Sequence, residues 1–136
     1  RNRFFVFLLQ MSSQIKTLMI MDELFVKDII ESDIAVATDA GDKLFDVIVS
    51  LLNDKKPVVL DFNGINILTT AFLNAAIGQL YNNDQFSSEF LNDYLKVVNV
   101  QTEDRPLFSM VIKRAKEYFK NKKGFEDSAN QAFYGR

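Results

Sequence analysis

Apolar residues recur along three segments of the chain at the spacing of one helix face. The first segment places five of them at i, i+1, i+4, i+7 and i+8: Leu44, Phe45, Ile48, Leu51 and Leu52. Such a stripe is typical of an amphipathic helix. The spacing predicts helices over residues 38–53, 69–80 and 102–124, and a short helical turn over 87–91. Each begins at a threonine or serine, which are preferred N-cap residues. We expect the last helix to end at Gly124, a common stop residue.

Short runs rich in β-branched residues separate these helices. They cover residues 16–25, 34–37, 58–62 and 94–100. The run 58–62 has turn residues on both sides and almost no polar residue, as in a central strand buried on both faces. Strands that alternate with helices require crossover connections. The predicted fold is therefore a single small α/β domain, with a mixed, mostly parallel sheet of about four strands and helices packed on it.

The two ends of the chain differ from this central domain, which we place at residues 15–123. Residues 124–136 are expected to form a C-terminal tail. Residues 1–14 are read as an N-terminal extension, either an extra strand or a segment foreign to the natural chain. Its apolar run, residues 4–9, is too short to cross a bilayer, and no small-residue cleavage site of a secretory signal follows it. Self-association through this run is an alternative.

Composition removes several kinds of chemistry. The chain has 136 residues, 48% of them hydrophobic, which suits one globular domain. It contains no Cys and no His, so Ser-His and Cys-His nucleophiles and most zinc sites are excluded. The lack of cysteine suits a reducing cytosol, and we expect a cytoplasmic protein. A net charge of -2 argues against chain-wide nucleic-acid binding, although residues 113–123 carry a basic face that could meet an acidic partner or only solvent.

The segment 58–78 contains the most informative motif. Its strand ends in Asp61-Phe62, a turn follows, and a hydroxyl pair precedes Phe-Leu and a helix. This order resembles STAS-like domains, distant relatives of the anti-sigma factor antagonists, and the resemblance extends more loosely over residues 16–120. In those antagonists Asp-Ser-Ser-Gly opens the helix and a partner kinase phosphorylates one serine. When the two motifs are matched in order, Thr70 falls at the position of the phosphorylated serine, with Thr69 beside it. The chain departs from the pattern, because Thr69 replaces the acid and Phe72 replaces the glycine.

The resemblance implies a non-catalytic regulatory module that docks another protein, for which a kinase-like ATPase is the suggested partner. Phosphorylation of Thr70 would change the charge of the docking surface. We expect no cofactor, no metal, no membrane and no nucleic acid. The residues expected to meet the partner follow the strand and open the helix: Asn63, Gly64, Phe72, Leu73 and Asn74.

Three alternatives stay open. Thr69 or Thr70 could act only as a helix cap. Asp61 could fix its loop by accepting backbone hydrogen bonds, or it could bind a nucleotide or metal in a small enzyme together with Asp39 or Asp42, since ligands gather at the carboxyl ends of parallel strands. The chain could also be a structural homo-oligomer.

Overall fold

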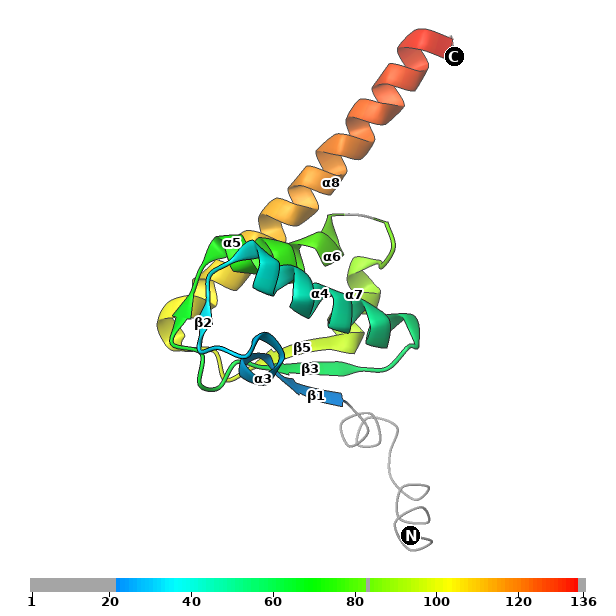
Figure 1. Cartoon of the computed structure of the whole chain (residues 1–136). Coiled ribbons are helices and arrows are strands. Elements are labelled where there is room, and N and C mark those ends of the chain that lie inside the picture. The colour runs from blue at the N-terminus through cyan, green and yellow to red at the C-terminus, as the bar shows by residue number, and fades with distance from the viewer. Residues whose placement is uncertain (1–21, 83, 135–136) are drawn as a thin grey trace, which may run out of the picture.

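The computed structural model in Figure 1 describes residues 22–82 and 84–134. The strands are β1 (Asp22–Phe25), β2 (Ile34–Ala35), β3 (Val58–Asp61), β4 (Ile67–Leu68) and β5 (Leu95–Val98). The helical elements are α3 (Val26–Ile30), α4 (Thr38–Asn53), α5 (Thr70–Leu73), π-helical η1 (Asn74–Gly78), α6 (Gln79–Tyr81), α7 (Ser88–Tyr94), 3-10 helical η2 (Thr102–Asp104) and α8 (Arg105–Tyr134). The predicted N-terminal extension, residues 1–14, lies outside the described residues.

All described strand pairs are parallel, and they form two sheets. One has the order β1-β3-β5 and the other pairs β2 with β4. The α/β fold and the central position of β3 are confirmed, but the single sheet of about four strands is wrong. After β3 the chain turns at Gly64, where φ is 86°, and the following strand β4 pairs with β2 instead of joining β1, β3 and β5. Residue patterns predict strands, but they do not determine which strands become neighbours.

The core lies between the three-stranded sheet and the helices. In Figure 1, α4, α6 and α7 lie on one side of that sheet, and α8 extends away from the domain. Leu44, Ile48 and Leu52 of α4 are buried, as the apolar stripe predicts, and they face a layer that includes Leu60 of β3. Burying a side chain of this size contributes about 1.5–3 kcal/mol, so α4 is held to the sheet mainly by this stripe.

The first part of α8 packs on the helical layer through Phe108, Val111 and Ala115. Lys116 adds a cation–π contact, because its Nζ lies 5.3 Å from the centroid of the Tyr81 ring. Burial raises the pKa of the Tyr81 phenol. At least one cation of the predicted basic face therefore contributes to packing.

Two predicted helix boundaries are wrong. The N-cap of α4 is Ala37, whose carbonyl accepts the amide of Gly41 at 3.2 Å, so Thr38 is already the first helical residue. The last helix continues through Gly124 to Tyr134, and residues 124–134 are helical instead of a separate tail. A glycine costs a helix about 1 kcal/mol relative to alanine, which weakens the helix without ending it.

Gly41 sets the distance between α4 and the helical segment 70–81. A Cβ added at Gly41 would lie 2.6 Å from the carbonyl oxygen of Phe72 and 2.7 Å from the Cβ of Ala75. Both are atoms that cannot rotate away. The absence of a side chain at this position lets the two helices touch along their backbones.

We predict that Gly41→Ala destabilises the domain. Overpacking costs about 1–3 kcal/mol and should outweigh the roughly 1 kcal/mol that alanine gains in helix propensity. Gly78→Ala is the matched control, because its Cβ would meet its nearest neighbours only at 3.4 Å. Urea unfolding of both variants measures the difference. Equal stability of Gly41→Ala and the wild type would show that the helices are not in close contact.

Candidate functional site

A buried carboxylate ties together the loops that follow two neighbouring strands. Asp61 ends β3 and is 4% exposed. Its Oδ1 accepts hydrogen bonds from the backbone amide of Asn63 and from Nδ2 of Asn99, both at 2.9 Å. Asn99 follows β5 and has a φ of 60°, a left-handed conformation that asparagine tolerates better than most residues. This arrangement is that of a loop-fixing aspartate.

The turn after Asp61 presents backbone to the solvent. Asn63 and Gly64 are both exposed. The amide of Ile65 donates to the carbonyl of Phe62 at 3.1 Å and closes the turn. A side chain at Gly64 would be strained by its positive φ, and its Cβ would lie 3.1 Å from Cδ of Lys27. The turn therefore depends on glycine.

The hydroxyl of Thr69 is used twice. Thr69 is the N-cap of α5, and its Oγ1 accepts the amide of Phe72 at 3.2 Å. The same hydroxyl donates to the carbonyl of Val36 at 3.0 Å. Thr69 thus caps the helix and fastens it to the segment after β2.

Thr70 differs from its neighbour. It is the first residue of α5 and is partly exposed. Within the described part of the chain, no hydrogen bond of its hydroxyl is found. Of the two threonines, Thr70 has the hydroxyl that is not required for capping.

The β2–β4 pair carries an exposed apolar surface next to these threonines. Ile34 and Ile67 are register partners in a parallel pair, so their side chains point to the same side. They are 48% and 50% exposed, and Val36, two residues beyond Ile34, is 39% exposed. We call Ile34, Val36 and Ile67 the ladder patch. Sequence reasoning missed it, because residues 34–37 are all apolar and their pattern does not show which side is exposed.

The predicted docking residues separate into two groups. Asn63, Gly64 and Asn74 are exposed. Phe72 and Leu73 are fully buried, so their predicted role in meeting a partner is wrong. The helix they open lies between α4 and α8, and these two side chains fill the space on both sides.

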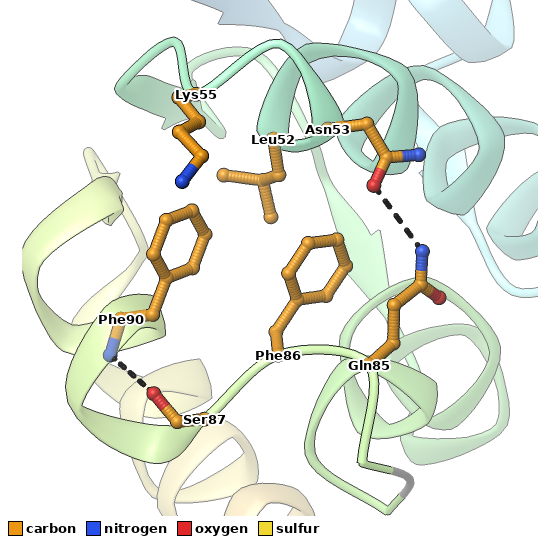
Figure 2. A pocket seen from close by; sticks show the side chains of 7 residues that line it. All are labelled: Leu52, Asn53, Lys55, Gln85, Phe86, Ser87 and Phe90. Carbon is orange, nitrogen blue, oxygen red and sulfur yellow. Dashed lines mark hydrogen bonds between the residues drawn. The ribbon is translucent and has the colours of Figure 1, made fainter.

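A separate pocket of about 360 Å³ lies at the far end of α4 (Figure 2). Its lining comes from the end of α4 and the turn after it, and from the segment before α7 and α7 itself: Leu52, Asn53, Lys55, Gln85, Phe86, Ser87 and Phe90. The rings of Phe86 and Phe90 stack with centroids 5.6 Å apart, and the Lys55 side chain points toward Phe90. The pocket lies at the C-terminal end of α4, whereas Thr69 contacts Val36 before the N-terminal end of that helix, so the two are distinct.

The three aspartates singled out from the sequence do not form a metal site together. Among the described residues, no group of three or more His, Cys, Asp or Glu side chains is placed to hold a metal ion, so Asp61, Asp39 and Asp42 are not a three-carboxylate ligand set. Asp42 instead accepts a hydrogen bond from Nε2 of Gln79 at 3.1 Å. None of the helices in the described part of the chain combines the length and hydropathy that a bilayer crossing requires.

Comparison with known proteins identifies the domain. Residues 40–105 match a family model described as a STAS-like domain of unknown function (DUF4325). The match begins in α4 and ends at the first residue of α8, so it includes β3, the turn after it, the start of α5 and β5. The resemblance to STAS-like domains that the sequence predicts is therefore confirmed over residues 40–105. Searches of curated proteins and of solved structures each returned no match.

We predict that Asp61→Ala destabilises the domain by about 1–3 kcal/mol, because two donors lose their acceptor. Asp61→Asn should cost less, because one carbonyl oxygen remains. Asn99→Gly keeps the positive φ but removes the amide. In a double-mutant cycle of Asp61→Ala and Asn99→Gly, measured by urea unfolding, we expect a coupling energy of about 0.5–3 kcal/mol. Strictly additive effects would contradict a direct hydrogen bond.

Proposed function

We propose that this chain is a non-catalytic regulatory module that docks a protein partner through the ladder patch and the adjoining start of α5. One observation carries the proposal: Ile34 and Ile67, register partners in a two-stranded ladder, are 48% and 50% exposed, and Val36, just after that ladder, is 39% exposed. Exposed apolar residues that cluster, and are not scattered singly, mark interaction surfaces.

The surroundings of the ladder patch support a specific contact. Thr69 fixes the start of α5 to the carbonyls of Ala35 and Val36, at 3.1 and 3.0 Å, so the patch and the helix start form one rigid surface. Side-chain ordering on docking is then small, which favours binding. Asn66 donates to Asp33 at 2.6 Å and supplies a polar border.

Regulation at Thr70 is a further part of the proposal. A phosphate at the first residue of a helix meets free backbone amides and the positive end of the helix dipole. It would also place nearly two negative charges beside the apolar ladder patch, which raises the desolvation cost of docking. The family resemblance makes a kinase-like ATPase the first partner to test.

We predict that Ile34→Asp combined with Ile67→Asp abolishes partner capture from a native lysate. Both side chains are about half exposed, so we expect an unchanged fold by circular dichroism. Tyr118→Asp is the matched control, because this side chain is also large and 58% exposed but lies on α8. Mass spectrometry of the captured proteins is the measurement. Capture of the same proteins by the double variant and the wild type would refute the docking surface.

We predict opposite effects of Thr70→Glu on stability and on docking. A carboxylate at a helix start stabilises by about 0.3–1 kcal/mol, so the melting temperature should rise slightly or stay constant while capture falls. Ser88→Glu introduces the same charge at the first residue of α7 and should leave capture unchanged. If both variants reduce capture equally, the effect is one of net charge and not of the position beside the ladder patch.

A further inference from the structure

A second surface, distinct from the ladder patch, lies beside β5. It is an apolar groove of about 470 Å³ between the end of β5 and the first turns of α8. Its lining is mostly aliphatic and aromatic: Val97, Val98, Asn99, Val100, Arg105, Phe108 and Ile112. We call it the β5 groove. Its volume lies within the range of about 300–1,000 Å³ that is usual for small-molecule pockets, so the groove is large enough to take several side chains.

The strand that borders the β5 groove has an open edge. Within the described residues, β5 pairs with β3 on one side and has no strand on the other. The amide of Phe62 donates to the carbonyl of Val98 at 3.0 Å, so Val98 turns its backbone groups toward β3. Backbone groups alternate along a strand, and those of Val97 therefore point away from β3. An edge of this kind is a template for another strand.

The opposite wall comes from α8. Arg105, Phe108 and Ile112 stand at i, i+3 and i+7, so they share one helix face. The ring of Phe108 meets that of Phe62 edge-on, with centroids 5.1 Å apart, which fixes the floor of the groove. The Arg105 guanidinium is exposed, and the structure shows an ion pair in the described part of the chain only between Lys43 and Glu31. Arg105 thus provides a positive charge at this wall that is not held in an ion pair, although Glu103 and Asp104 precede it in the chain.

We propose that the β5 groove binds an extended peptide segment of a partner protein, which adds to β5 as a strand. The backbone of the peptide pairs with Val97, alternate apolar side chains enter the groove, and a carboxylate meets Arg105. Strand addition beside a helix gives affinity through main-chain bonds and specificity through alternate side chains. The charge of Arg105 selects an acidic peptide.

A peptide fits this space better than a second copy of the chain. The helix α7 ends at Tyr94, directly before β5 begins at Leu95. A second copy paired through β5 would bring its own α7 with the strand, and a helix is about 10–12 Å across with its side chains. The groove is open to a single extended strand.

Selection from a phage-displayed library of random octapeptides tests the proposal on the full chain. We expect enriched peptides with alternating apolar residues and an Asp or Glu at one end. Val97→Pro removes the outward amide, and the edge position tolerates proline. It should weaken binding of the selected peptides about tenfold, because a main-chain bond is lost and the edge is blocked. Arg105→Gln should weaken it about two- to fivefold, as exposed ion pairs do.

Two controls separate this groove from the ladder patch and from misfolding. Val97→Ala keeps the amide and should retain most of the binding. The Ile34→Asp and Ile67→Asp double variant should bind the selected peptides like the wild type. Amide hydrogen exchange should show protection of Val97 on binding. Urea unfolding shows whether the Val97→Pro variant is folded. If this variant is not folded, protection of the Val97 amide from hydrogen exchange in the peptide-bound wild type decides the result.

Three results would overturn the proposal. One is a selection that yields no binder. Another is that the selected peptides bind but leave the amide hydrogen exchange of Val97 unchanged, or that they bind the Arg105→Gln variant as tightly as the wild type. The third is light scattering that shows a dimer whose formation protects Val97, because a second copy would then occupy the edge. Loss of the ladder-patch function alone would leave this proposal intact.

Discussion

The buried carboxylate of Asp61 is the constraint on which the rest of the arrangement depends. A charge removed from water is tolerated only when it is paired or hydrogen-bonded, and here the partners are the loops after β3 and β5. Because Asn63 begins the path to β4 and α5, and Asn99 begins the path to α8, one carboxylate oxygen fixes the direction of both. Ile67 of the ladder patch and the α8 wall of the β5 groove therefore lie on segments whose starting points are set by the same side chain.

A second constraint acts between the helices. Gly41 allows α4 to touch the segment 70–81 along its backbone, and Ala75 and Ala76 continue this surface of small residues. The close approach holds the start of α5 beside the start of α4, near the end of β2. Thr69 then completes the junction by donating to the carbonyl of Val36. The start of α5 is positioned by backbone contact on one side and by a hydroxyl on the other.

Much of this could be predicted where local pattern and tertiary environment agree. The uniform run 58–62 predicts a buried strand, and Leu44, Ile48 and Leu52 predict the buried face of α4. The prediction of exposed residues failed at Phe72 and Leu73, where other elements cover the helix on two sides. Within α5 and η1 only Ala71 and Asn74 are exposed, and a helix that is apolar almost all round is a buried one. The apolar pattern around Phe72 and Leu73 therefore indicates burial, whereas the resemblance to STAS-like domains predicts that both residues lie on a docking surface. The two surfaces proposed for binding are likewise beyond local pattern, because each combines segments that only the fold brings together.

The exposed apolar residues of the ladder patch are not explained by the stability of the fold alone. β2 and β4 each alternate one exposed and one buried residue, and the buried positions Ala35 and Leu68 join the core. The exposed positions could carry polar residues without loss to that core, yet they carry Ile34 and Ile67. An exposed ladder with an apolar outer side invites association, and proteins usually place charge at such edges. The aliphatic side chains contribute little to folding where they stand, because about half of their surface remains in water. Their energetic contribution becomes large only when a second surface covers them, and this is the physical reason to place docking at the ladder patch.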